Sequence, residues 1–339
     1  MRSVKFLAVV ALALLFTLPG HAAEPYKLRI GWVVAGADLA TLMFAKPELA
    51  PHAGKTYIPE LTHFEGTSTA MQALATGELD TAALAYSTFA LGVVNAGMQD
   101  LRVIGDGFQD GVPGYHTNGY FVRNDSPIRT VEDLKGKVIA TNQRGSAVDM
   151  AVRAMLAKHN LQDKRDVTMI EVRFPDQKAM LKEGKVDLIT SPLPFGADPE
   201  LLVFAHPLFT QLDAIGRSQM IVRVAREPFL KAHRAAMVDF LEDYLHTLQY
   251  LLDPAHHAEG VALLSQVTKQ KPELFDAWAF TNKDYYRDPK GLPDLGALQA
   301  NIDLQHQLTF LRSSLDVKKY ADSSIAEEAA RRLASEASH

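Results

Sequence analysis

The chain has 339 residues, of which 47% are hydrophobic, and its formal net charge is −5 at pH 7. This length and composition suit two domains with real cores, and the mild acidity gives no case for a nucleic-acid partner. The chain contains no cysteine, which excludes disulfides, thiolate catalysis and a cysteine-linked lipid anchor.

The first residues have the pattern of a cleavable secretory signal. Arg2 and Lys5 supply a positive start, and an apolar run covers residues 6–18. Small residues follow, and we expect cleavage after Ala22, with Ala23 as the alternative. The apolar run is too short to span a bilayer comfortably, and no later stretch approaches the length of a membrane helix. An exported chain without disulfides or anchor fits the periplasm of a two-membrane bacterium.

The next eighty residues alternate strands with helices. We expect strands at residues 27–34, 57–64, 79–86 and 101–104. Helices fall between them, and one ends at Gly77, where glycine suits the left-handed position after a helix. This alternation at short spacing predicts a mainly parallel sheet with helices on both faces.

A similar unit follows a polar, glycine-rich segment at residues 106–118. We expect strands at 119–123, 137–141, 167–172 and 186–191, with a return strand at 220–224. Thr130 and Asp133 have the capping spacing of a short helix, and longer helices are expected at about 148–156 and 176–183. The second helix–glycine–strand unit, at Gly184, matches the one at Gly77. Two such units suggest two lobes with a ligand between them.

From Glu227 onward the pattern is helical. An apolar stripe follows that residue in a long helix, and further helices are expected at 255–268, 272–280, 295–311 and 323–333. We expect these helices to pack on the first lobe.

Several segments of the chain have a distinctive order and spacing. They are residues 27–32, 73–86, 121–128 and 131–137, together with Val317, Tyr320, Asp322, Ile325, Glu327 and Ala329. In these segments the chain resembles the substrate-binding proteins of bacterial ABC importers. The most similar group binds aliphatic sulfonates, taurine, nitrate or thiamine precursors, and the resemblance covers nearly the whole chain after the signal.

The resemblance implies an α/β fold of the two-lobed periplasmic binding protein type (type II). Each lobe would be a mainly parallel sheet flanked by helices, with a helical C-terminal region. It also implies that the first lobe is built from both ends of the chain. After the signal peptide at 1–22, we expect a first lobe from 23–113 and 222–339 and a second lobe from 114–221. A small anionic ligand would bind in the cleft of a monomer and pass to an ABC permease, with ATP hydrolysis in a separate subunit.

Four loops are placed to bind this ligand, because ligands of open α/β sheets lie beyond the carboxyl ends of the strands. They cover residues 33–38, 66–69, 87–88 and 143–146. Hydroxyls there can donate to an oxyanion, and the candidates are Thr67, Ser68, Thr69, Ser87, Thr88 and Ser146, with Gly145 for close backbone approach. Each hydroxyl can instead be a simple helix cap, but their convergence on one cleft favours binding.

Arg144 is the sharpest single candidate, because a guanidinium at a helix start can hold a carboxylate or sulfonate through two hydrogen bonds. A solvated surface arginine is the alternative. Gln219, beside the return strand, can also face the cleft. Trp32 can stack on a ligand or be a core residue, and Ser191 and Pro192 should form an apolar wall on the second lobe.

No pattern predicts a cofactor, a metal site or catalysis. His256 and His257 have only Glu259 close by, and two or three local ligands rarely hold a metal. Walker A, G-x-S-x-G and H-E-x-x-H patterns are absent from the sequence. Pyrimidine synthases of thiamine biosynthesis share the expected fold, but they are cytosolic and use a cysteine-rich motif, whereas this chain has no cysteine. A periplasmic sensor remains the alternative to import, and a thiamine-precursor pyrimidine or an aromatic carboxylate remains the alternative ligand.

Overall fold

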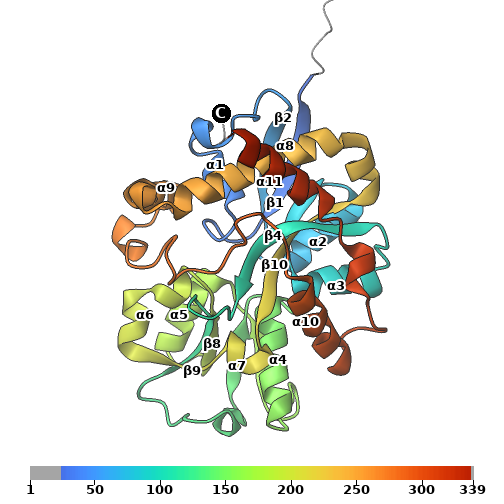
Figure 1. Cartoon of the computed structure of the whole chain (residues 1–339). Helices are drawn as coiled ribbons and strands as arrows, with labels where there is room; N and C mark the ends of the chain where they lie inside the picture. Colours follow the sequence, from blue (N-terminus) through green and yellow to red (C-terminus); the bar gives the residue numbers. More distant parts are fainter. Residues whose placement is uncertain (1–23, 337–339) are drawn as a thin grey trace, which may run out of the picture.

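The computed structural model describes residues 24–336, so the predicted signal peptide lies outside the described residues. Within them, two five-stranded sheets define two lobes (Figure 1). The first lobe is built on the sheet with strand order β2-β1-β3-β10-β4, and the second on the order β7-β6-β8-β5-β9. The predicted two-lobed α/β fold is confirmed, with one refinement: both sheets are mixed, because each contains one strand that runs against its neighbours.

The strands of the first lobe follow the predicted alternation. They are β1 (Tyr26–Trp32), β2 (Tyr57–His63), β3 (Thr81–Ala85), β4 (Leu101–Asp110) and β10 (Ser218–Arg226). The strand β1 pairs in parallel with β2 and β3, whereas β10 runs antiparallel to β3 and β4. We expected β4 to end near residue 104, but the glycine-rich residues that follow continue to pair with β10 through register shifts.

Helices cover both faces of this first sheet. They are α1 (Ala40–Met43), α2 (Thr67–Thr76), α3 (Tyr86–Val94), α8 (Glu227–Leu252), α9 (His257–Thr268), α10 (Leu295–Gln307) and α11 (Ser324–Glu336). Helix α2 ends at Gly77 with φ 78°, as its sequence predicts. The helix predicted at 272–280 is wrong: only a 3-10 turn forms, at Pro272–Leu274, and Phe280 has a positive φ of 59°.

The second lobe has strands β5 (Gly119–Arg123), β6 (Val138–Thr141), β7 (Thr168–Glu171), β8 (Leu188–Ser191) and β9 (Ala205–Thr210). Its helices are α4 (Ala147–Lys158), α5 (Phe174–Lys182), α6 (Pro199–Phe204) and α7 (Gln211–Ile215). The sequence did not predict β9, α6 or α7. The short helix expected after Thr130 is a 3-10 turn, although Asp133 does accept a hydrogen bond from the backbone N–H of Thr130 at 2.9 Å.

The chain passes between the lobes twice, from β4 to β5 and from β9 to β10, and these crossings lie side by side in the middle of the molecule (Figure 1). A third segment, residues 284–291, pairs with the first of these crossings. The backbone N–H groups of Gln109 and His116 donate to the carbonyls of Tyr286 and Asp284 at 2.8 and 2.9 Å. The two crossings and this segment together form a three-stranded hinge region. The residues at which the lobes divide stay a prediction.

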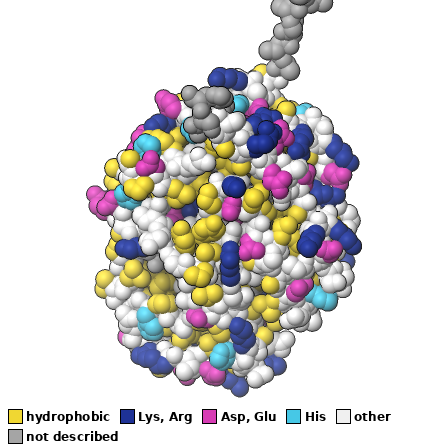
Figure 2. All heavy atoms as spheres, viewed as in Figure 1, with side chains coloured by type: hydrophobic (Ala, Val, Ile, Leu, Met, Phe, Trp, Pro, Cys, Tyr) yellow, Lys and Arg dark blue, Asp and Glu magenta, His cyan; other side chains and the backbone are white. Residues whose placement is uncertain are grey.

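Charged side chains of both signs are interspersed on the face seen in Figure 2, in keeping with the small net charge. Among the helices of residues 24–336, none combines the length and apolar character that crossing a membrane requires.

Candidate ligand-binding site

A cavity lies between the two lobes, with an empty volume of about 690 Å³ that includes part of its open mouth. The first lobe contributes the loop after β1, the start of α2 and strands β3, β4 and β10. The second lobe contributes the starts of α4 and α5 and the loop after β8. The lining residues used below are Asp38, Thr67, Phe108, Asn142, Ser146, Ala147, Phe174, Pro192, Leu193, Arg223, Tyr244 and Tyr285.

Aromatic and aliphatic side chains form most of the cavity wall. The ring of Phe108 stacks on that of Tyr285, with centroids 4.1 Å apart and planes 19° apart. Tyr244 and Phe174 add rings from helix α8 and from the start of α5. Such a wall suits a ligand with a flat, apolar body, because buried apolar contact stabilises binding without requiring directional partners.

One ion pair is built into this apolar wall. The guanidinium of Arg223 donates from Nη2 to Asp38 Oδ1 at 2.6 Å, and both residues are nearly fully buried, at 3% and 7% exposed. Asp38 also accepts from the backbone N–H of Ala40 at 3.1 Å, which fixes the carboxylate at the start of α1. Sequence reasoning missed this pair. The signal was present, because a lone arginine inside an apolar strand requires a buried acidic partner.

A polar network links the cavity to the hinge. The hydroxyl of Tyr285 donates to Asn118 Oδ1 at 2.5 Å and accepts from the backbone N–H of Leu193 at 2.9 Å. Asn118 in turn donates its backbone N–H to Asp110 Oδ2 at 2.9 Å. Burial raises the pKa of the Asp110 carboxyl to about 7, and the hydrogen bonds from Thr117 and Asn118 only partly oppose this.

Three of the residues predicted to bind the ligand line this cavity: Thr67, Ser146 and Pro192. Ser146 caps α4, accepting from the backbone N–H of Asp149 at 3.3 Å, and its hydroxyl donates to Asn142 Oδ1 at 2.8 Å. The strand–loop–helix pattern therefore selected three residues of the cavity wall, and their role in ligand binding stays a prediction. Ser146 is both the cap of α4 and part of this wall.

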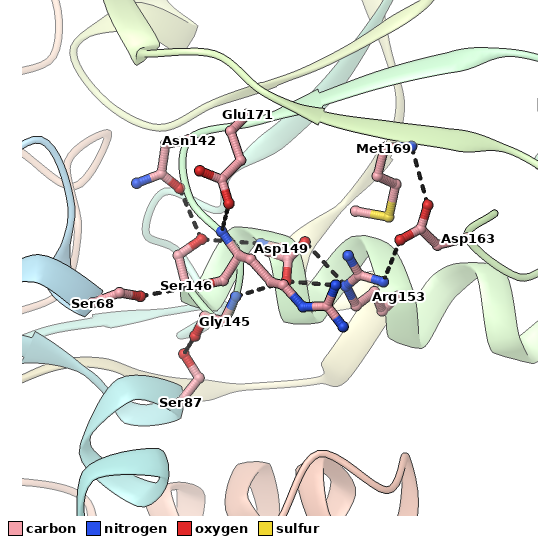
Figure 3. A network of polar contacts seen from close by, with 11 residues as sticks. Ser68, Ser87, Asn142, Gly145, Ser146, Asp149, Arg153, Asp163, Met169 and Glu171 are labelled. Carbon is pink, nitrogen blue, oxygen red and sulfur yellow. Dashed lines mark hydrogen bonds and ion pairs between the residues drawn. The ribbon is translucent and has the colours of Figure 1, made fainter. Parts of the chain in front are cut away.

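Four other predicted residues lie together, but at a contact between the lobes (Figure 3). The hydroxyl of Ser87 donates to the carbonyl of Gly145 at 2.8 Å, and that of Ser68 to the carbonyl of Arg144 at 3.1 Å. The side chain of Arg144 is exposed and lines a separate outer groove between α3, α4 and the end of α10. The two serines thus hold the second-lobe loop, and the guanidinium of Arg144 does not line the cavity.

The remaining predicted residues make local contacts outside the cavity wall. Thr69 and Thr88 lie in the first turns of α2 and α3, and their hydroxyls donate to the carbonyls of Gly66 and Ala85 at 2.8 and 3.0 Å. Trp32 packs on His63, with ring centroids 4.5 Å apart. Gln219 is fully buried and donates to Asp106 Oδ1 at 2.5 Å, and Ser191 is buried at the end of β8.

One cluster could hold a metal ion by its composition. Ligand atoms of His52, Asp239 and Glu242 lie within 4.8 Å of one another beside α8. However, His52 Nδ1 lies 2.7 Å from Asp243 Oδ1, and Arg332 pairs with Asp239 at 3.0 Å. The charges of the cluster are thus already engaged, away from the cavity.

Comparisons with solved structures support the fold. The chain is similar to the alkanesulfonate-binding protein SsuA from Xanthomonas axonopodis pv. citri, at 22% identity over 89% of this chain and 99% of that one, with a TM-score of 0.70. It is similar to the periplasmic nitrate-binding protein NrtA from Synechocystis PCC 6803, at 17% identity over 92% and 90%, with a TM-score of 0.70. The desulfurization enzyme DSZB also matches, at 16% identity over 90% and 99%, with a TM-score of 0.63.

A comparison with curated protein sequences finds no significant match. A family model, however, matches residues 21–265, which is well over half of the chain and covers all ten strands of the two described sheets. The chain therefore belongs to the NMT1-like family.

Proposed function

We propose that this protein is a periplasmic solute-binding protein that captures one small molecule between its lobes and delivers it to an ABC permease. The observation that carries this proposal is the cavity, which takes its wall from both lobes beside a three-stranded hinge. Closing two lobes on a ligand converts binding free energy into a shape that a membrane partner recognises. The fold shared with alkanesulfonate- and nitrate-binding proteins supports the same role.

The proposal includes export through cleavage of residues 1–22 and a division of the mature chain at 113/114 and 221/222. It also includes action as a monomer beside a permease with its own ATPase. Binding is also the role in which the described wall positions Ser146, since its hydroxyl donates to the amide oxygen of Asn142, which is not a general base.

The sequence predicted a small organic anion, such as a sulfonate, taurine or a carboxylate. That prediction rested on Arg144 and the hydroxyl loops, and Arg144 lies outside the cavity wall. The solute that we propose here is defined by the cavity: it is small, and most of its surface is apolar.

A thermal-shift screen of a broad metabolite panel, followed by small-angle scattering with each hit, tests this function. We expect a bound solute to raise the melting temperature and to reduce the radius of gyration. As a control, Ala147→Phe should remove both effects, because Ala147 is buried at the cavity wall at the start of α4. The matched variant Ala157→Phe, at an exposed position of the same helix, should keep them. Hits that bind equally well to both variants would contradict the proposed site.

A further inference from the structure

The cavity is balanced in charge. Asp38 and Arg223 are the charged residues on its wall, and they neutralise each other at 2.6 Å. The next buried cation, Arg287, packs behind Phe108 and pairs with Asp284 at 3.3 Å. Both charged side chains of the described wall are therefore already paired with each other, and burying an ionic ligand without a side-chain counter-ion is costly.

The same wall carries unsatisfied hydrogen-bonding groups of both kinds. Among the described residues, Asp38 Oδ2, Arg223 Nη1 and Thr67 Oγ1 are buried and have no hydrogen-bond partner. The first accepts, the second donates, and the hydroxyl can do either. Each residue lines the cavity and is less than a tenth exposed. Buried polar atoms without partners are rare in native proteins, and a bound ligand is one way to satisfy them.

From this wall we infer that the solute is an uncharged aromatic compound whose polar edge joins a hydrogen-bond donor to an acceptor, as a primary amide does. The inference rests on the proposed solute-binding function and names its ligand class. The donor would face Asp38 and the acceptor Arg223, while the ring would lie against Phe108 and Tyr285.

Four compounds that share the same benzene ring and differ in the head group test the inference: benzamide, benzoate, benzenesulfonate and benzamidinium. Affinities for the full-length mature protein would be measured at neutral pH by ligand-observed NMR. We expect benzamide to bind at least about tenfold more tightly than each charged compound. Tighter binding of an anion or of the cation would overturn the charge inference and leave solute binding intact.

If none of the four binds below about 10 mM, the inferred class is wrong, because a matching fragment should reach that affinity. The broad metabolite screen then decides the proposed function separately.

The variant Asp38→Asn gives a second readout, because it removes the negative charge and leaves Arg223 uncompensated. The ratio of benzoate to benzamide affinity should rise about tenfold, and this ratio is insensitive to overall stability. The control is Asp125→Asn, since Asp125 also pairs with an arginine, Arg123, at 2.9 Å but is exposed. An unchanged ratio in Asp38→Asn would show that the pair does not set the charge preference.

Discussion

The hydroxyl of Ser87, at the start of α3 in the first lobe, donates a hydrogen bond to the carbonyl of Gly145 in the second lobe at 2.8 Å. Both residues are buried. The hydroxyl of Ser68, in α2, likewise donates to the carbonyl of Arg144, the residue before Gly145. Two hydroxyls, one from α2 and one from α3, thus bind the same loop of the second lobe (Figure 3).

Replacing Ser87 by alanine should weaken lobe closure. The variant leaves the buried carbonyl of Gly145 without this donor, which costs about 1 kcal/mol. Because that contact joins the lobes, we expect solute affinity to fall about fivefold by calorimetry. The matched control is Thr88→Ala, since Thr88 donates within its own helix start. Equal losses in the two variants would show that Ser87 acts on folding and has no special role in closure.

The side chain of Arg144 should matter little for binding. It is exposed in the outer groove, and its loop is held by backbone groups: the N–H of Arg144 donates to Glu171 Oε1 at 2.9 Å. Arg144→Gln should therefore change the dissociation constant of a verified solute by less than about twofold. A loss of more than about tenfold would support the sequence-based hypothesis of an arginine-bound anion.

Asp110 should make stability depend on pH. Its folded pKa, raised by burial to about 7, exceeds the ordinary value of 3.8. Between these values the unfolded chain releases a proton that the folded chain keeps, so the free energy of unfolding falls as pH rises from about 4 to about 7. Asp106, on the same strand, also has a pKa raised by burial to about 7 and adds to the effect.

The variant Asp110→Asn removes its share of this dependence. The free energy of unfolding of the variant minus that of the parent protein should rise by about 2 to 4 kcal/mol between pH 4.5 and pH 7.5. Urea denaturation at both pH values measures this difference. His116, whose pKa burial lowers to about 4, contributes with the opposite sign, but it does so equally in both proteins. A stability difference that is constant across this range would show that Asp110 is ionised throughout.

Tyr285→Phe should keep the ring against Phe108 and remove the hydroxyl between Asn118 and Leu193. Two buried polar groups then lose a partner, which should lower the free energy of unfolding by about 1 to 3 kcal/mol. Tyr286→Phe is the control, because that residue is less buried and packs only edge-on against Tyr115. Stability would be measured in urea, and similar values for the two variants would argue against a role for the Tyr285 hydroxyl at the hinge.

Local sequence signals predicted most of the regular structure. Gly77 ends α2 because a left-handed conformation favours glycine there, and the stripe after Glu227 forms α8 because its apolar face meets the core. Strand β9 escaped prediction because it lies at a sheet edge, contains Pro207 and has little apolar alternation. The turn at Phe280 replaced a predicted helix for a tertiary reason, since its ring packs against Gly260 in α9.

The site was predictable in position and not in chemistry. Loops after strands led to Thr67 and Ser146 because their place follows from fold geometry alone. The partner of Arg223 lies 185 residues away at Asp38, and no local spacing encodes such a pair. For the same reason, the sequence did not reveal that Ser68 and Ser87 contact backbone carbonyls of the second lobe.

The third hinge segment, residues 284–291, is synthesised after every strand of the two sheets, which bears on the order of folding. Every strand of both sheets precedes it in the chain, yet its backbone pairs with both ends of the hinge, at Asp106 and at His116. During synthesis each lobe can therefore form its sheet before this segment pairs with the hinge. A chain cut short just before this segment would keep both sheets and both crossings, and would lose the backbone hydrogen bonds that this segment accepts from Asp106, Gln109 and His116.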